Sequence, residues 1–218
     1  MKDNVFVEIF HLLAAHYGPQ HWWPGETKLE ILVGAVLTQN TNWSNVVKAI
    51  DNLKASDMLS LPILQQASIE AIAQRVRPAG YYNLKARRLV NLLEMIREVY
   101  GGELNSLLDD DTGTARRNLL SVKGVGPETA DAILLYAGGH PLFVVDAYTH
   151  RVFCRHQLVP EECDYHELQE IFTANLPADA QLFNEYHALI VRLGKDFCKK
   201  NNPLCRECPL HGVEGRRV

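Results

Sequence analysis

The chain has 218 residues, a formal net charge of −4 and a hydrophobic content of 47%. This length suffices for one large domain or two small lobes, and the hydrophobic content is inconsistent with a wholly disordered chain. The sequence has no apolar run of about 18 residues and no signal-peptide pattern, so we expect a cytoplasmic protein without a membrane partner.

Apolar residues recur at helical spacing along the chain, and no period-2 strand pattern appears. Residues 29–37 are apolar on nearly every side, which predicts a buried central helix. Residues 89–99 and 182–193 carry apolar side chains three and four positions apart, which predicts two further helices. Asp164 followed by Glu167 is typical of a capping box at the start of another helix. We therefore predict an all-α protein of short helices.

Basic residues gather in short clusters although the chain as a whole is acidic. The clusters are Lys85, Arg87 and Arg88; Arg116 and Arg117; Arg151 and Arg155; and Lys195, Lys199 and Lys200. The negative net charge argues against nonspecific coating of nucleic acid, but a specific DNA enzyme needs only local clusters of this kind. Taken alone, each cluster is most simply interpreted as a solvated helix face.

The most informative segment is a glycine-rich stretch in the middle of the chain. Gly124 and Gly126 flank Val125; glycine permits positive φ and close backbone approach, while the valine can pack into the core. Pro127 and Glu128 then suit the first turn of a helix. The pattern predicts two helices joined by a tight hairpin, whose N–H groups can hold a phosphate oxygen directly or through a monovalent cation. By itself, it fits an ordinary helix connection equally well.

The flanking motifs decide between these interpretations, because together they resemble the endonuclease III superfamily of helix-hairpin-helix DNA glycosylases. The motifs are Leu120–Ala130, Phe143-Val144-Val145-Asp146, Leu37-Thr38-Gln39-Asn40 and Gly80-Tyr81-Tyr82-Asn83-Leu84-Lys85-Ala86. The resemblance covers most of the chain. It implies an all-α, two-lobed fold with a central cleft, in which residues 29–138 form a helical barrel lobe and residues 1–28 plus 139–218 form the second lobe.

The resemblance also implies a partner and the residues that bind it. The partner is double-stranded DNA with a damaged base, bound by a monomer. Gln39 would fill the hole that a flipped base leaves, with Asn40 beside it; a surface glutamine at a helix end is the alternative. The hairpin residues that would hold the DNA backbone are Val122, Lys123, Gly124, Val125 and Gly126.

By the same resemblance, the essential carboxylate is Asp146. A carboxylate near an N-glycosidic bond stabilises the positive charge that develops on the sugar, and it can orient or deprotonate the attacking water. Asp146 is also a good cap for a helix that begins near Ala147, and the two roles are compatible. Strand-cleaving members carry a lysine where this chain has Glu128, which cannot form an imine, so we predict weak or absent lyase activity.

The tryptophans suggest which base is removed. Core packing is the usual role of such residues, but Trp22-Trp23-Pro24 is turn-prone and Trp43 follows the expected DNA-facing segment. Aromatic rings stack on a flipped base and attract cationic alkylated purines. The combination looks like the 3-methyladenine DNA glycosylase III branch of the superfamily, which implies a pocket of these four residues and Glu128.

This branch predicts excision of alkylated purines such as 3-methyladenine. One alternative is an endonuclease III-like glycosylase for oxidised pyrimidines or mismatched bases. The other is a DNA-binding module without catalysis, against which the presence of Asp146 argues.

Five cysteines without a secretory signal argue against a disulfide framework. Cys198, Cys205 and Cys208 have the spacing of the first three ligands of the superfamily's [4Fe–4S] loop. The fourth cysteine is expected six residues later, where the chain has Glu214. Glu214 or His211 as fourth ligand, a labile or three-iron cluster, a zinc site with His211, and free thiols all stay open.

Such a cluster is structural in the superfamily and presents basic loop residues to DNA phosphates, here Lys199 and Lys200. Cys154 and Cys163 have no ligand spacing and are interpreted as core or surface thiols.

Overall fold

A computed structural model describes residues 4–213, and within this range it contains helices and loops but no strand. The predicted all-α class is confirmed. The chain divides into two compact units, one of Met1–Trp22 with Pro141–Val218 and one of Trp23–His140. Every helix within residues 4–213 is too short or too polar to cross a bilayer.

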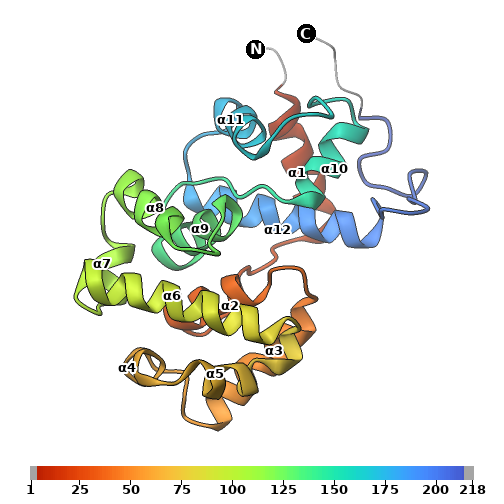
Figure 1. The fold of residues 1–218 in the computed structure, drawn as a ribbon. Coiled ribbons are helices and arrows are strands. Elements are labelled where there is room, and N and C mark those ends of the chain that lie inside the picture. The colour runs from red at the N-terminus through yellow and green to blue at the C-terminus, as the bar shows by residue number, and fades with distance from the viewer. Residues whose placement is uncertain (1–3, 214–218) are drawn as a thin grey trace. The chain divides into compact units, whose positions relative to one another are not determined.

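The unit Trp23–His140 is built around α2 (Lys28–Leu37), the helix predicted at residues 29–37 (Figure 1). Every residue of α2 from Glu30 to Leu37 is buried, because other elements of the unit surround it. Helix α2 contacts α3 (Trp43–Ala55), α6 (Tyr82–Tyr100), α9 (Pro127–Ile133) and the π-helical turn η2 (Leu134–Gly138). The unit also holds α4 (Leu61–Gln66), α5 (Ile69–Arg75), the 3₁₀ turn η1 (Arg77–Ala79), α7 (Leu104–Leu108) and α8 (Thr112–Ser121).

Helix α6 follows its predicted apolar pattern with two exceptions. Its buried stripe is Leu89, Leu92, Leu93 and Ile96, whereas Val99 is 54% exposed at the end of the helix. Lys85, which the sequence groups with a solvated basic cluster, is fully buried instead. Its ammonium donates to Leu37 O at 2.9 Å and Ala79 O at 2.7 Å, so a charge that is costly to bury is hydrogen-bonded by the ends of α2 and η1.

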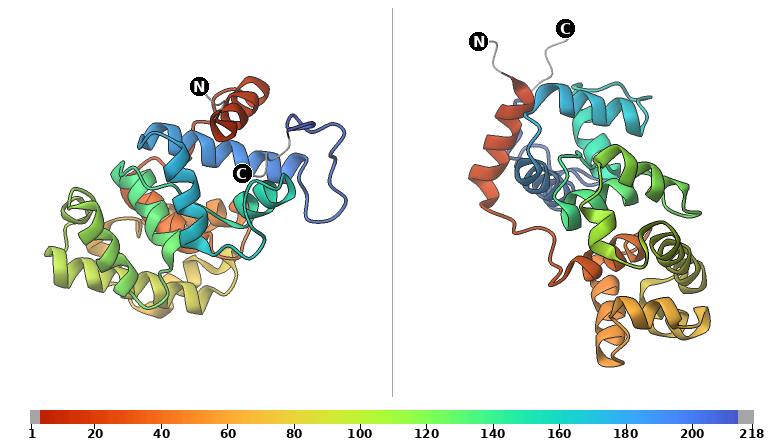
Figure 2. Two further views of the ribbon diagram at one scale, coloured as in Figure 1. Left: turned by 90° about the horizontal axis from the view of Figure 1, so that it is seen from above. Right: turned by 90° about the vertical axis from the view of Figure 1, so that its left-hand side faces the viewer.

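The unit Met1–Trp22 with Pro141–Val218 holds α1 (Val5–Tyr17), α10 (Ala147–Arg155), α11 (Tyr165–Asn175) and α12 (Ala180–Asp196). In Figures 1 and 2, α12 is flanked by α1 and α10, and it contacts both. The predicted capping box is confirmed, since Asp164 accepts from the backbone of Glu167 and the Glu167 carboxylate accepts from Asp164 N.

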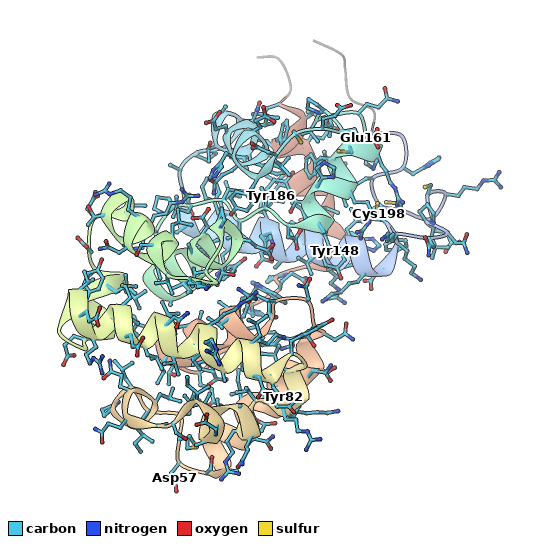
Figure 3. All side chains as sticks on the ribbon, viewed as in Figure 1. Asp57, Tyr82, Tyr148, Glu161, Tyr186 and Cys198 are labelled. Carbon is cyan, nitrogen blue, oxygen red and sulfur yellow. The ribbon has the colours of Figure 1, made fainter. Side chains whose placement is uncertain are left out.

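Aromatic rings form the core of this unit. Phe143 stacks on Phe172 at 4.1 Å, and Phe172 contacts Phe6, Phe153 and the buried Tyr186 edge-on. Tyr186, labelled in Figure 3, donates its hydroxyl to Phe6 O at 2.8 Å. Because Phe143 and the next two residues are buried, this core fixes the segment that leads into α10.

The contact between α10 and α12 depends on Gly194, which leaves room for Tyr148. A Cβ at residue 194 would overlap Cδ1 of Tyr148 and lie 3.1 Å from its Cβ. Arg151 stacks on the same ring at 4.9 Å and donates to Gly194 O at 3.1 Å. The side chains of Tyr148 and Arg151 and the backbone of Gly194 therefore set the register of one helix against the other (Figure 3 labels Tyr148).

We expect Gly194→Ala to lower the free energy of unfolding by about 1–2 kcal/mol, because the overlap with Tyr148 outweighs the better helix propensity of alanine. In a Tyr148→Ala background, the same substitution should be neutral or stabilising, since the ring is gone. Urea unfolding of the four proteins measures both effects. Equal destabilisation in the two backgrounds would contradict this account of the contact.

Candidate DNA-binding and active site

Asp146 is the N-cap of α10, as its capping role predicts. Its Oδ1 accepts from Tyr148 N and Thr149 N, both at 2.8 Å, and from Thr149 Oγ1 at 3.0 Å. The Thr149 hydroxyl in turn accepts from Asp146 N, which completes a capping box. One carboxylate oxygen is therefore fixed by the first turn of the helix, and the orientation of the second follows from it.

The second oxygen, Oδ2, faces His187 on α12, whose Nε2 lies 3.6 Å away. Both side chains are largely buried. Burial raises the pKa of Asp146, but the nearby His187 imidazole, together with the bonds from Thr149, outweighs this effect and holds the pKa below its ordinary value. His187 was missed from the sequence because it lies on the apolar face of a helix, where a histidine is most simply part of the core.

Asp146 is also positioned from the side of the chain that precedes it. Phe143, Val144 and Val145 are buried, and Phe143 O accepts from Gln169 Nε2 of α11 at 2.7 Å. The carboxylate therefore sits where a buried extended segment meets a helix start.

The predicted hairpin lies between α8 and α9, but its two glycines serve different needs. Gly124 adopts a φ of +102°, which L-residues rarely adopt, whereas Gly126 is extended at −98° and caps α9 without a side-chain bond. The hairpin expectation of core packing is confirmed, since Val122 and Val125 are each 6% exposed. Only Gly124 needs glycine for its backbone conformation.

The helices on either side of the hairpin are joined by an ion pair that the sequence did not reveal. Arg116 of α8 donates Nε to Asp131 Oδ1 at 2.6 Å and Nη2 to Oδ2 at 3.1 Å, and Asp131 is fully buried. Arg116 is thus not part of a solvated basic face. This two-bond geometry fixes the angle at which the hairpin is presented.

Gln39 lies against the hairpin within the same unit. Its Nε2 donates to Thr129 Oγ1 at 2.9 Å and Gly124 O at 3.2 Å, and its Oε1 accepts from Arg88. Asn40 beside it is exposed with a φ of +52°. The expected DNA-penetrating segment and the hairpin are therefore brought together, although they are far apart in the sequence.

A cluster of three half-buried aromatic rings forms in the unit Trp23–His140. Trp23 contacts Trp43 edge-on at 4.8 Å and Tyr136 in a tilted arrangement at 5.1 Å. Gly34 of α2 leaves room for the Trp23 indole, because a Cβ at residue 34 would lie 3.3 Å from the ring. We call Trp23, Trp43 and Tyr136 the aromatic cluster; sequence reasoning missed Tyr136, which lies in a π-helical turn with no motif to mark it.

The other expected pocket residues are placed as follows. Trp22 is half-buried and belongs to the other unit, Pro24 is exposed, and Glu128 is exposed in the first turn of α9. Tyr81 also stands out, since its side chain is 75% exposed and its backbone is left-handed with φ +44°. A large aromatic held in this way is unusual for a purely structural residue.

The C-terminal cysteine loop is tied to α10 by arginine. Arg155 donates to Lys199 O at 2.7 Å and Lys200 O at 3.0 Å, so both exposed lysines are held at the backbone, and Arg155 Nη1 also reaches Cys198 Sγ at 3.4 Å. Cys198 lies just beyond α12 in Figure 3. Arg155 of α10 therefore holds the backbone of this loop in place.

The donor set of this loop does not fit a four-thiolate cluster. Burial, and then the charges of Cys198 and Cys205, raise the pKa of Cys208. Within residues 4–213, however, no group of three or more His, Cys, Asp or Glu side chains is arranged to hold a metal ion. His211 is exposed, and Glu214 lies outside the described residues.

Comparison with known proteins identifies the family. The family model of the HhH-GPD superfamily base excision DNA repair protein matches residues 33–178. A Methanocaldococcus jannaschii protein provisionally named a DNA repair glycosylase is 49% identical over 96% of this chain and 97% of its own length. Endonuclease III of Thermotoga maritima is 31% identical over 83% of this chain and 79% of its own length.

Among solved structures, H. pylori 3-methyladenine DNA glycosylase bound to 1,N6-ethenoadenine is similar with a TM-score of 0.77. It is 34% identical, and the match covers 88% of this chain and 97% of that one. A hairpin between two helices in an all-α chain defines the class, which is that of helix-hairpin-helix proteins. The chain belongs to the HhH-GPD superfamily of base excision DNA repair proteins and is a DNA glycosylase.

His187 gives a pH-dependent prediction. Because the folded-state pKa of Asp146 is lowered, this carboxylate stabilises the fold above its unfolded pKa, and the stabilisation is lost as pH falls through the folded pKa. Replacing His187→Asn leaves burial to raise the folded-state pKa of Asp146, so the loss of stability between neutral and acidic pH should become smaller than in the wild type or reverse. Urea unfolding between about pH 3 and pH 6 measures the shift.

The matched control is the Asp146→Asn background, in which no carboxylate titrates at this position. There, His187→Asn should leave the pH dependence below neutrality much less changed. An equal shift in both backgrounds would show that another group, not Asp146, responds to His187.

Proposed function

We propose that this glycosylase is monofunctional and removes alkylated purines such as 3-methyladenine from double-stranded DNA in base excision repair. The aromatic cluster is the observation that carries the choice of base. Electron-rich rings attract a cationic purine, and the half-buried faces leave ring area that a flipped base can use. The 34% identity to a 3-methyladenine DNA glycosylase supports the same substrate class.

We propose Asp146 as the catalytic residue. Its lowered pKa keeps the carboxylate ionised at neutral pH, and a negative charge stabilises the cation that forms on the sugar as the base departs. The same lowered pKa makes it a weak base, so electrostatic stabilisation and orientation of water are favoured over deprotonation. An alkylated purine is already cationic and needs little protonation to leave, which suits a site that supplies mainly negative charge.

The remaining residue assignments are part of this proposal. Trp22, Pro24 and Glu128 join the aromatic cluster in base binding, and the hairpin Val122–Gly126 holds the DNA backbone, directly or through a monovalent cation. Lys199 and Lys200 bind DNA phosphates, since both are exposed and held at their backbone by Arg155. The loop presents them through these arginine bonds.

An excision assay on duplexes with an alkylated purine, an oxidised pyrimidine or a mismatch tests the proposal. We expect abasic sites, revealed by alkali, mainly in the alkylated duplex. Preference for the oxidised or mismatched duplex would favour an endonuclease III-like specificity. No excision from any duplex would leave a DNA-binding module without catalysis.

Two substitutions separate the chemical role of Asp146 from its capping role. Asp146→Asn keeps a good N-cap but removes the charge, so single-turnover excision should fall by roughly a hundredfold or more while the capping contribution to stability is kept. Asp146→Ala should lose excision and also about 1 kcal/mol of stability. Full activity of Asp146→Asn would remove the catalytic assignment.

The monofunctional assignment rests on Glu128, which offers no amine for an imine. We expect borohydride to trap no covalent complex of the wild-type protein with alkylated DNA, and no strand break before alkali. A Glu128→Gln variant is the matched control, because it also lacks an amine and should behave alike. A borohydride-trapped complex with the wild type would show that another amine performs lyase chemistry.

A further inference from the structure

Arg88 of α6 lies across the hairpin although no motif marks it. A Cβ at residue 124 would overlap Cγ of Arg88 and lie 2.9 Å from its Cδ and 3.0 Å from its Nε. The arginine stem therefore passes directly over Gly124, and the absence of a side chain there makes room for it. This is a second reason for glycine at the position, beside its positive φ.

The guanidinium of Arg88 has a neutral partner and no acidic one. It donates to Oε1 of Gln39. Among residues 4–213, the ion pairs of arginine side chains involve Arg97, Arg116 and Arg192, and none involves Arg88. Burial of Lys85 lowers the pKa of its ammonium group, and the nearby positive charge of Arg88 lowers it further. A half-buried positive charge thus lies at the hairpin without a counter-charge.

The chemistry of this position suits a phosphate. A guanidinium presents five N–H donors in a planar fork, and one bond to Gln39 leaves the others for an anion. A phosphodiester oxygen would supply the negative charge and accept charge-assisted hydrogen bonds. The neighbouring Arg87 is exposed and does not share these contacts, so position 88 differs from a general basic surface.

We propose that Arg88 is a DNA-contacting residue, which binds a backbone phosphate beside the hairpin while its bond to Gln39 holds that amide against Gly124. The proposal rests on the proposed function as a DNA-binding glycosylase. It adds a charged contact to a hairpin otherwise expected to bind through backbone N–H groups.

The test is the salt dependence of binding to a duplex with an abasic-site analogue. Each phosphate contact contributes about 0.9 to the slope of log K against log salt, so Arg88→Met should reduce the slope by about one. Affinity at low salt should fall about tenfold, because a charge-assisted bond is lost while the apolar stem over Gly124 is kept. Arg88→Lys should keep the slope and lose part of the affinity.

Two controls make the result specific. Arg87→Met removes the same charge from the exposed neighbour and should change the slope much less; an equal change would overturn the proposal. Gln39→Ala removes the amide but no charge and should keep the slope. If Arg88→Met also keeps the wild-type slope, Arg88 acts only through Gln39 and the phosphate contact is excluded.

Failure of the proposed function has a different signature. A wild-type protein that does not bind the duplex at low salt would refute DNA binding itself. Normal wild-type binding with an unchanged slope in Arg88→Met refutes the Arg88 assignment alone. Circular dichroism and thermal unfolding of each variant confirm that binding is compared between folded proteins.

Discussion

A buried carboxylate that stays ionised is the constraint on which the rest of this molecule depends. Burial alone would raise the pKa of Asp146, so the charge must be stabilised by groups fixed in place. The first turn of α10 supplies donors to one oxygen, and His187 of α12 faces the other. Both helices must therefore hold their register, which explains why Gly194 is packed against Tyr148 and why Phe143 is locked in an aromatic core.

The hairpin between α8 and α9 also depends on groups that are fixed in place, here for its backbone N–H groups. Backbone N–H groups bind a phosphate with a fixed geometry only if the loop that carries them is held in place. Three side-chain contacts hold this hairpin. Arg116 clamps Asp131 across the two helices, Asn91 donates to Lys123 O at 2.9 Å, and Gln39 donates to Gly124 O. Buried Lys85 then ties the end of α2, just before Gln39, to the turn before α6. The polar contacts of this unit converge on the segments expected to meet DNA.

The basic residues divide into those that carry structure and those left for a partner. Lys85, Arg116, Arg151 and Arg155 are each used on carbonyl or carboxylate groups of the protein. Arg88, Lys199 and Lys200 keep charge that no acid of the described chain neutralises by an ion pair. An acidic chain can thus offer positive charge locally, because the position of a charge matters more than the net charge.

The sequence by itself determined the elements and the motifs. Helical spacing, the Asp164 capping box and the glycines around Val125 are local patterns, and local patterns act through backbone geometry that neighbouring residues impose. Asp146 was singled out by the resemblance of Phe143–Asp146 to a known superfamily motif, and the local sequence added only its role as a helix cap. The all-α class, the buried α2 and the hairpin followed from these signals.

Only the tertiary structure decided which distant groups meet. His187 and Tyr136 lie in stretches whose apolar pattern hides them, and Lys85 and Arg116 look like surface charges until their partners are known. The sequence placed Gln39 in the expected DNA-facing segment but could not show that its amide is bonded to Thr129, Gly124 and Arg88. The physical reason is that burial and pairing depend on residues from 15 to 90 positions away, and no local spacing encodes such contacts.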